Sequence, residues 1–535
     1  MNDAKITSIT SKTGTLHKMN EVKILWADDE IDLLRPHVLF LEQKGYHVTT
    51  VNNGGEAADL VDSEFFDIVF LDENMPGLSG LETLQRIKKI DHTVPVVMIT
   101  KSEEESIMEE AIGSKIADYL IKPVNPNQIL MSLKKSLDAK RIRSEKTTSG
   151  YQQQFREISM QLMDRMDFGQ WSELYKKLIF WGLELQASDD EAMSEIYKTQ
   201  KAEANFQFAR YISQNYLHWL NQPEDAPLMS HRLFPDRIIP FMKNAVKPVL
   251  VLVIDNLRYD QWKVLQPRIS EYYRVETEEV FCSILPTATH YARNAIFAGM
   301  LPSEISKKFP RLWKDEEDEG GKNMHEADFL EDQLRRLRQD GKWSYNKITN
   351  LNAGKKLAEN YHELSNNKLN VIVYNFVDML SHARTDMEVI KELADDDAAY
   401  RSLTQSWFDH SPLLDILKQA SESGHELVIT TDHGTIRVES PVKIVGDRNT
   451  NSNLRYKTGK NLNYTAKDVF EVKNPDEAFL PKSHVSSSFV FAMQDSYFVY
   501  PNNYNHFVNF YRNTFQHGGV SLEEMLIPFV TLQPK

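Results

Sequence analysis

The sequence is poor in cysteine and has no long apolar segment. Its 535 residues include one cysteine, Cys282, so an internal disulfide framework is excluded and the chain fits a reducing compartment. We expect Cys282 to be buried as a packing residue rather than to act as a reactive thiol. Since no run of about 18 consecutive apolar residues occurs, the sequence predicts no membrane-spanning helix and a cytoplasmic protein.

Positively charged residues are fewer than negatively charged ones. The chain has 62 lysine and arginine residues against 77 aspartate and glutamate residues, which gives a formal net charge of −15. This balance disfavours capture of duplex DNA through its phosphates, and no DNA-binding motif is present. Residues 1–18 lack the apolar core of a signal peptide, and we expect them to be a disordered tail ahead of Met19.

The length and the changes of pattern along the chain predict three folded parts. A chain of 535 residues is too long for one hydrophobic core. We expect an α/β domain over 20–140, a helical bundle that acts as a spacer over 141–235, and a second α/β domain over 245–535. The Pro-rich stretch "NQPEDAPLMSHRLFPDR" precedes the last part and indicates a boundary.

Five short apolar runs alternate with amphipathic segments in the first part. The runs cover residues 22–27, 47–51, 67–71, 95–99 and 117–121. This alternation predicts a parallel sheet with helices on both faces, and ligands of such sheets bind at the carboxyl ends of the strands. Polar residues stand at these ends: Asp28 and Asp29 after the first run, Asp72 after the third, Thr100 after the fourth, and Lys122 with Pro123 after the fifth.

This set of residues resembles the receiver domain of two-component response regulators, whose motifs match "DD", "LDENMPG", the single threonine and "KP" in order. The resemblance implies a flavodoxin-like fold with strand order 2-1-3-4-5. It also implies that a sensor histidine kinase phosphorylates Asp72, which is the nucleophile of that reaction. Mg²⁺ would be held by Asp29, Asp72 and the carbonyl group of Asn74, with Asp28 behind them.

The same resemblance assigns roles to the residues at the other strand ends. Lys122 neutralises the phosphoryl charge, and the peptide bond before Pro123 is expected to be cis. Thr100 and Tyr119 occupy the places of the family's switch pair, which reorients when the acyl phosphate forms. We therefore expect the chain to form a homodimer on phosphorylation, through the receiver face that carries Tyr119.

Apolar residues recur at helical spacing between residues 130 and 220. One such stripe consists of Met160, Leu162, Met163, Met166, Leu174, Leu178 and Ile179. The spacing i, i+3, i+4 and i+7 predicts amphipathic helices. We interpret the methionine and aromatic residues of these helices as the core of a small bundle rather than as a groove for a partner.

In the C-terminal part, three apolar, strand-like runs are followed by side chains that can bind metals. These are Asp255 after residues 249–254, Asp378 and His382 after "LNVIVYNFV", and Asp432 and His433 after "ELVITT", and a further histidine, His517, stands in the turn "QHGG". Each motif alone is more often a polar turn. Together, at the converging ends of parallel strands, they predict a site for two Zn²⁺ or Mn²⁺ ions, which nitrogen and oxygen ligands without cysteine suit.

The order Asp, Thr, Asp-x-x-x-His, Asp-His-Gly and His-Gly resembles the alkaline phosphatase superfamily, in its PglZ branch. The resemblance implies a metal-dependent phosphoesterase with an alkaline-phosphatase-like α/β fold. It places one metal on Asp378, His382 and His517, and the other on Asp255, Asp432 and His433.

The stretch "LPTATHYARNAIFAGM" supplies the nucleophile that this resemblance requires. Its second threonine aligns with the nucleophile of the nucleotide pyrophosphatase/phosphodiesterase relatives, so Thr289 is the expected nucleophile and metal ligand, and Thr287 is the fallback. Where those relatives place an asparagine on the phosphate, this sequence reads "ISKKFPRLW", so the phosphate donors stay open. Candidate donors are Arg258, Asn294, Lys307, Lys308 and His484.

Two further positions carry weaker signals. Asn256 directly follows Asp255 and could orient it. His325 and Glu326 are similar to a metal-binding pair, but the start of a helix is the better interpretation of "NMHEADF".

The order of receiver, helical spacer and PglZ-like domain resembles PorX-type response regulators, which are associated with type IX secretion and gliding. Our first hypothesis is a receiver-controlled phosphodiesterase with two zinc ions that cleaves nucleotide or oligonucleotide diesters. The resemblance implies that it acts through a secretion or gliding component or a transcription factor. The alternatives are a phosphorylation-controlled adaptor whose metal domain is structural, and a phosphomonoesterase.

Overall fold

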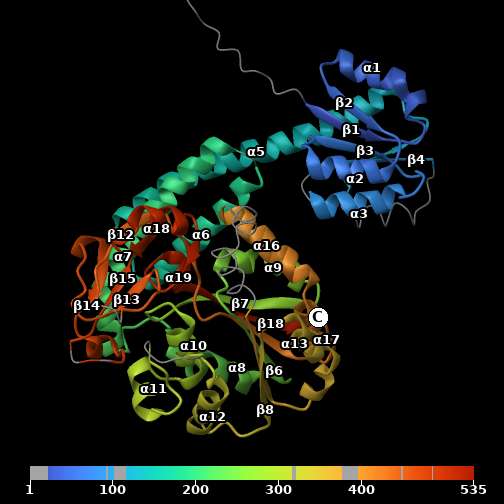
Figure 1. Ribbon diagram of the computed structural model, residues 1–535. Helices are drawn as coiled ribbons and strands as arrows, with labels where there is room; N and C mark the ends of the chain where they lie inside the picture. Colours follow the sequence, from blue (N-terminus) through green and yellow to red (C-terminus); the bar gives the residue numbers. More distant parts are fainter. Residues whose placement is uncertain are drawn as a thin grey trace, which may run out of the picture. The chain divides into compact units, whose positions relative to one another are not determined.

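The computed structural model describes residues 22–91, 94–101, 116–188, 190–315, 321–375, 396–446, 450–482, 484 and 486–535, with the side chains of 138–145 left aside. The chain divides into two compact units (Figure 1). The first unit runs up to Gly150 and includes Ala187–Asp190, and the second contains Tyr151–Gln186 and Glu191–Lys535. None of the helices in these described ranges is both long and apolar enough to cross a bilayer.

The first unit contains a parallel sheet. Its strands are β1 (Lys23–Ala27), β2 (His47–Val51), β3 (Ile68–Asp72), β4 (Val96–Thr100) and β5 (Asp118–Ile121). They are ordered β2-β1-β3-β4-β5, and every neighbouring pair is parallel. This order confirms the flavodoxin-like fold expected from the sequence.

Helices pack on both faces of this sheet. They are α1 (Arg35–Gln43), α2 (Gly54–Ser63), α3 (Gly80–Ile90) and the first turns of α5 (Pro126–Met163). Apolar residues of α1 and α5 join one core, and those of α2 and α3 join the core on the opposite face. The start of α3 is fixed by a capping box, in which Ser79 and Glu82 satisfy each other's backbone amides.

The second unit is built on a mixed sheet ordered β7-β18-β10-β6-β9-β8. Its strands are β6 (Val249–Ile254), β7 (Tyr273–Cys282), β8 (Trp343–Ile348), β9 (Leu369–Tyr374), β10 (Glu426–Thr430) and β18 (Leu526–Pro534). Strands β10, β6, β9 and β8 are parallel, whereas β18 is antiparallel to both of its neighbours. Every residue of β6 is buried, as its unbroken apolar run predicts.

The remaining elements of this unit surround that sheet. The helices include α8 (Ile239–Asn244), α9 (Tyr259–Ile269), α10 (Thr289–Ala298), α11 (Pro302–Lys308), α12 (Glu326–Arg336), α13 (Leu351–Glu359), α16 (Asp397–His410), α17 (Pro412–Glu422), α18 (Tyr504–Tyr511) and α19 (Leu522–Met525). The shorter strands are β11 (Ile436–Arg437), β12 (Ser440–Lys443), β13 (Tyr456–Gly459), β14 (Val469–Val472), β15 (Ser488–Ala492), β16 (Ser496–Val499) and β17 (Phe515–Gln516). Cys282, at the end of β7, is fully buried as predicted, and burial raises the pKa of its thiol.

Two long helices between the α/β parts, α6 (Phe168–Gln186) and α7 (Glu191–Asn221), belong to the second unit. Their apolar residues share one continuous hydrophobic core with the six-stranded sheet. The predicted stripe is buried at five of its seven positions, but Met160 and Met163 are 61% and 87% exposed. For these two methionines the core interpretation was wrong, because they lie at the end of α5 where the described residues place no neighbour over them.

Candidate phosphoryl-acceptor and metal sites

The receiver site lies at the carboxyl ends of β1, β3 and β5. Asp28 and Asp72 are buried, and Nζ of Lys122 lies 2.9 Å from Oδ2 of Asp28 and 2.8 Å from Oδ1 of Asp72. Carboxylate oxygens of Asp28, Asp29 and Asp72 lie within 4.8 Å of one another, which is close enough to hold one cation. The peptide bond between Lys122 and Pro123 is cis, as predicted.

The protonation of this site follows from its burial. Burial raises the pKa of Asp72, although the hydrogen bond from Lys122 acts in the opposite direction. Burial would lower the pKa of Lys122, but the hydrogen bonds to Asp72 and Asp28 raise it, so the lysine stays charged beside the acceptor. A fixed cation at this position suits the incoming charge of a phosphoryl group.

The other predicted receiver residues surround this pair. The hydroxyl group of Thr100 donates to the carboxylate of Glu73, which follows Asp72. Tyr119 is half-buried on β5, the strand that pairs with the one carrying Thr100. Asn74 is exposed beyond β3. The roles of Thr100 and Tyr119 as a switch pair, and of Asn74 as a magnesium ligand, stay predictions.

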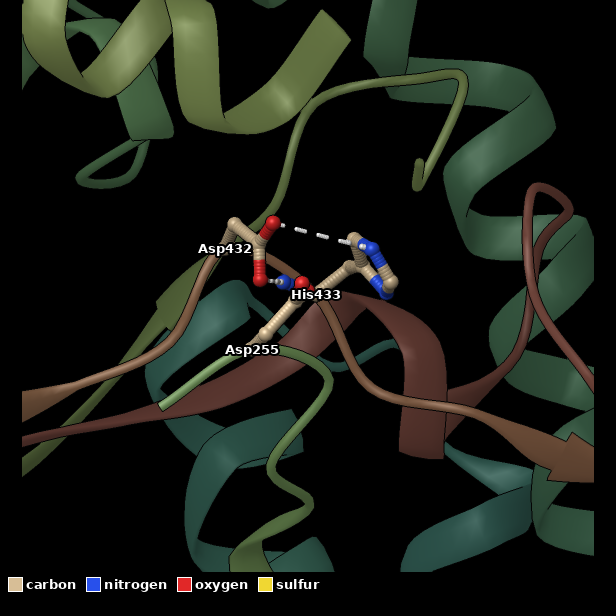
Figure 2. A group of neighbouring side chains, drawn as sticks. All are labelled: Asp255, Asp432 and His433. Carbon is tan, nitrogen blue, oxygen red and sulfur yellow. Dashed lines mark hydrogen bonds and ion pairs between the residues drawn. The ribbon is translucent and has the colours of Figure 1, made fainter. Parts of the chain in front are cut away.

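The second site forms where β6 and β10 end. These strands are parallel neighbours, so Asp255, directly after β6, meets Asp432 and His433, which come two and three residues after β10. The three side chains are fully buried and point toward one another (Figure 2), with one potential ligand atom of each within 4.8 Å of the others.

Backbone contacts between the two loops hold these side chains in place. Asn256 has a positive φ of 63°, and its amide donates to Oδ1 of Asp432 at 3.3 Å. The amide of Leu257 donates to the hydroxyl group of Thr431 at 3.0 Å. Asn256 thus positions the ligands through its backbone, and its left-handed conformation is one that asparagine adopts more readily than most residues.

The tautomer of His433 is set by its neighbour. Nδ1 lies 3.0 Å from the carbonyl oxygen of Gly434, which can only accept, so in the neutral ring Nδ1 carries the hydrogen. Nε2 is then left with its lone pair, the form in which histidine binds metals. Burial would raise the pKa of Asp432, but the positive charges beside it, that of the His433 ring when it is protonated and that of Arg293, lower the pKa, so Asp432 is an anion.

Thr289 is the threonine that reaches these ligands. It is the first residue of α10, and its Oγ1 lies 3.3 Å from Oδ1 of Asp255 and 3.1 Å from Nε2 of His433. Thr287 points elsewhere: its hydroxyl group donates to the carbonyl oxygen of Gly519 and accepts from the amide of Gly518. The geometry therefore favours Thr289 over Thr287 as the nucleophile.

Arg293 is a central residue that the sequence analysis missed. It is fully buried, its Nε donates to Oδ2 of Asp432 at 3.1 Å, and its Nη2 pairs with Asp255. Its Nη1 donates at 3.0 Å to Oδ1 of Asn375, the residue after β9. The sequence spacing could have indicated Arg293, because a residue four positions after Thr289 lies on the same face of a helix.

Glu326 extends this cluster of charges. Its carboxylate is buried 3.5 Å from Nε of Arg293 and accepts hydrogen bonds from Tyr345 and, at 2.7 Å, from Lys347. His325 instead pairs with Asp328 at the surface. Residues His325 and Glu326 therefore start α12, as the sequence interpretation favoured, with only the glutamate turned toward the site.

One residue of the other predicted metal set is described. His517 stacks on His433 with ring centroids 4.3 Å apart, and its Nδ1 lies 3.2 Å from the carbonyl oxygen of Thr287. Asp378 and His382 lie outside the described residues. The second metal stays a prediction.

Most of the candidate phosphate donors have other partners. The guanidinium group of Arg258 pairs with Asp260 and Asp397, Asn294 donates to the carbonyl oxygen of Lys322, and Lys308 pairs with Asp332. Lys307 stands near the end of α11, and His484 is exposed. None of these five is placed next to Thr289 by a described contact, whereas Arg293 lies among the ligands of the site.

These two sites and their folds define a two-component response regulator with a phosphatase-like output domain. The chain belongs to the PglZ family: a family model described as "BREX system PglZ alkaline phosphatase-like domain" matches residues 233–532. Residues 24–134 match the response regulator receiver domain, and residues 141–220 match the "PorX response regulator linker domain". This order of three parts is that of a PorX-type regulator, whose receiver domain implies phosphorylation by a sensor kinase.

Individual relatives match the receiver domain. The chain is 32% identical over 123 residues to the alginate biosynthesis transcriptional regulatory protein AlgB of Pseudomonas syringae, which covers 23% of this chain and 28% of that protein. It is 36% identical over 121 residues to the uncharacterized transcriptional regulatory protein YkoG of Bacillus subtilis, covering 22% and 52%. A CheY-like receiver structure from Methanospirillum hungatei is 28% identical, with a TM-score of 0.22, and covers 22% of this chain and 96% of that one.

Proposed function

We propose that the chain is a receiver-controlled, zinc-dependent phosphodiesterase that cleaves nucleotide or oligonucleotide diesters. The observation that carries the proposal is the position of the Thr289 hydroxyl group, 3.3 Å from Asp255 and 3.1 Å from His433, at the first turn of α10. A threonine with only a packing role would not need its hydroxyl group close to both a buried carboxylate and a histidine. The PglZ match supports phosphoester chemistry, and the diester preference rests on the resemblance of "PTAT" to the phosphodiesterase motif.

The donor atoms fit the predicted metals. Asp255, Asp432, His433 and Thr289 offer only oxygen and nitrogen, which Zn²⁺ or Mn²⁺ accepts. His517, with Asp378 and His382, would hold the second ion. When bound, such ions lower the pKa of a hydroxyl group and attract the oxygens of a phosphate.

The residues of the chain then carry the reaction. Asp255 accepts the hydrogen of the Thr289 hydroxyl group, which turns a lone pair of Oγ1 away from the carboxylate and toward the substrate. Oγ1 loses its proton and forms a bond to phosphorus, the bond to the leaving ester oxygen breaks, and that oxygen takes up the proton that Oγ1 lost. Water then attacks phosphorus, the bond between phosphorus and Oγ1 breaks, and Oγ1 takes a proton from that water as the product leaves. The N-terminal end of α10, where Thr289 stands, carries the positive end of the helix dipole and favours an anionic phosphate.

Arg293 balances the charge of the site. Asp255, Asp432 and Glu326 are buried around its guanidinium group, which holds their carboxylates in place through ion pairs. It is therefore expected to preorganise the site before substrate binds.

The receiver would control this output. We infer that a sensor histidine kinase phosphorylates Asp72 with Mg²⁺ bound, that the chain then dimerises, and that it regulates type IX secretion or gliding through a protein partner. Support comes from the Asp28, Asp29 and Asp72 cluster and from the linker match.

A phosphorylation-controlled adaptor is the second candidate function. It is favoured by the exposure of Met160 and Met163, since flexible methionine side chains on a surface suit partner binding. A partner would be a secretion or gliding component or a transcription factor. In that case the metal domain would be structural and would show no turnover.

The test measures zinc and magnesium content, and the hydrolysis of bis(p-nitrophenyl) phosphate and p-nitrophenyl phosphate, by the full chain. We expect the diester to be cleaved faster, Thr289→Val to abolish cleavage while zinc stays bound, and Thr289→Ser to keep part of the activity because it keeps a hydroxyl group. Zinc-loaded protein that cleaves neither ester would favour the adaptor. Faster cleavage of the monoester would point to a phosphomonoesterase.

A further inference from the structure

A partly buried network of charged side chains connects the linker helix α7 to residues next to the metal site. We call it the α7 network, and it consists of Lys201, Arg258, Asp260, Asp397, Arg401 and Glu523. Lys201 comes from the segment that matches the linker family, and the other five come from the segment that matches PglZ. The network therefore connects two parts of the chain that the sequence treats as separate domains.

Lys201 is the link across this boundary. Its Nζ lies 2.8 Å from Oε1 of Glu523 and 3.1 Å from Oδ2 of Asp397. Asp397 in turn accepts from Nη1 of Arg258 at 2.7 Å, and Arg258 pairs with Asp260. Arg258, Asp260 and Glu523 are almost fully buried, whereas the side chains of Lys201 and Asp397 are 18% and 31% exposed. Water therefore screens the Lys201–Asp397 pair more than the Arg258–Asp260 pair.

The network balances three cations against three anions, each with an opposite partner. Replacing buried ion pairs by apolar residues often costs nothing, whereas removing one partner of such a pair leaves an uncompensated charge. We therefore expect the α7 network to matter less for the free energy of unfolding than for the positions of the loops packed against it.

One of those positions is the loop of Asp432 and His433. The backbone of Gly434 packs so closely on Glu523 that a Cβ at residue 434 would stand 2.0 Å from the carbonyl oxygen of Glu523 and 3.4 Å from Cγ of Arg258. The amide of Gly434 also donates to the carbonyl oxygen of Glu524 at 3.2 Å. Arg258 itself comes three residues after Asp255.

Another is the loop of His517. The amide of Gly519 donates to the Glu524 carboxylate at 2.9 Å, which also pairs with Arg455. Since Glu523 and Glu524 are adjacent in the short helix α19, a contact that moves α19 acts on both ligand loops.

Asn205, one turn beyond Lys201 on α7, holds α19 directly. Its side-chain nitrogen donates to Oε2 of Glu523 at 3.0 Å, and its side-chain oxygen accepts from the amide of Leu522 at 2.8 Å. Helix α7 therefore contacts α19 both at the Leu522 backbone amide and at the Glu523 carboxylate.

We propose that α7 is a positioning element of the metal site and that Lys201 and Asn205 are its positioning residues. They hold Arg258 and α19, and through these the loops that carry Asp255, Asp432, His433 and His517. The inference rests on the proposed metal site, and it makes the linker helix the place where movement of the chain changes metal binding and turnover.

The test compares full-length variants. Lys201→Met removes the charge at similar length, Lys201→Arg keeps it, and Asn205→Ala removes both hydrogen bonds without leaving a buried charge unpaired. Lys198→Met, one turn away on α7 in an exposed pair with Glu195, is the matched control. Measurements are the rate of zinc release to a chelator, kcat and KM for bis(p-nitrophenyl) phosphate, and the thermal unfolding curve.

We expect Lys201→Met and Asn205→Ala to release zinc about tenfold faster and to lose about tenfold in kcat with KM little changed, as for other residues behind metal ligands. Lys201→Arg should restore most of both, and Lys198→Met should match the wild type. Folded Lys201→Met and Asn205→Ala proteins with wild-type zinc release and kcat would overturn the inference. If Lys201→Met fails to fold, the zinc release rate and kcat of Asn205→Ala decide whether α7 positions the metal site.

The two proposals fail in different ways. A wild-type protein that binds zinc but cleaves no ester ends the proposed phosphodiesterase, while the release rates still decide the role of α7. A wild-type protein that binds no zinc overturns both.

Discussion

Arg293 is the residue whose change should report most directly on the metal site. It is the cation among Asp255, Asp432 and Glu326, all fully buried. Arg293→Gln should cost about 3–5 kcal/mol of unfolding free energy in metal-free protein, because buried carboxylates lose their partner. With zinc bound the loss should be smaller, since the ion supplies positive charge. Denaturant melts with zinc and with a chelator measure both values.

A matched control for this prediction is Arg335→Gln. Arg335 pairs with Asp332, but its side chain is 78% exposed, and exposed pairs contribute about 0–1 kcal/mol. An equal loss for Arg293→Gln with and without zinc would mean that the arginine does not share its carboxylates with a metal.

Lys457 should make the stability of the second unit depend on pH. It is 1% exposed on β13, and burial lowers the pKa of its amine from 10.5 to about 7, although the amine donates to the carbonyl oxygen of Asn451 at 2.8 Å. Below pH 7 both states bind the proton and the folded state carries the full penalty, up to about 5 kcal/mol. Between pH 7 and 10.5 only the unfolded state binds it, so stability rises with pH.

The variant Lys457→Met should remove this slope. Its advantage over wild type should be largest at pH 7 or below and should shrink toward pH 10, as measured by urea unfolding across that range. Lys473→Met, at an exposed position, is the control. A difference that does not change with pH would exclude the lowered pKa as the cause.

Among the single residues of the metal site, the sequence predicts those that belong to a motif. Asp255, Asp432, His433 and Thr289 follow apolar runs or stand in "PTAT", and the structure brings them together. Arg293 and Glu326 were not predicted as site residues, because a charged residue in a helix is usually on the solvent side. Their burial depends on partners that are far away in the sequence, and periodicity does not name those partners.

At the scale of elements, the close approach of the metal loop to α19 gives a sharp prediction. Gly434→Ala would bring a Cβ within 2.0 Å of a backbone oxygen, which cannot turn aside as a side chain can. The loop of Asp432 and His433 should move, and zinc affinity should fall about tenfold or more. Competition with a chelator measures this.

Gly55→Ala is the control for that substitution. At residue 55 the nearest atom to an added Cβ is a side-chain oxygen 3.4 Å away, and the position lies in α2. Alanine there should leave zinc binding unchanged and should favour the helix by about 0.5–1 kcal/mol. Unchanged zinc affinity in Gly434→Ala would show that the loop tolerates the displacement.

The strands were easier to predict than the partners of the helices. All five receiver strands lie within a residue of the predicted runs. For β1, β3 and β4 the reason is that a parallel strand buried on both faces is a nearly continuous apolar run. The periodicity of α6 and α7 shows that one face is apolar but not what covers it. Gln200, Lys201 and Asn205 interrupt that pattern, and their contacts are with residues far along the chain or, for Gln200, with α5.

On the scale of the whole molecule, two sites of different chemistry share one chain. Asp72 lies in the first unit and Thr289 in the second, and the boundary at Gly150 falls inside α5. A signal from the receiver therefore has a continuous backbone helix to act on, and α7 is the linker helix whose side chains contact α19, which packs against the metal loops. Control of turnover through α7 and control through assembly are separable by experiment.

Assembly is tested by treating the full chain with beryllium fluoride and Mg²⁺, which together mimic a phosphoryl group on aspartate. The carboxylates of Asp28, Asp29 and Asp72 provide a place for the ion, and Lys122 provides a partner for the added charge. The new charge should draw Thr100 away from Glu73 and alter the surface at Tyr119 on β5. Sedimentation should then show twice the mass of the untreated chain.

Two variants serve as controls. Asp72→Asn should not respond, and Tyr119→Ala should bind the mimic yet stay monomeric. The same mass with and without the mimic would refute dimerisation and leave movement of α7 within one chain as the route from Asp72 to the metal site.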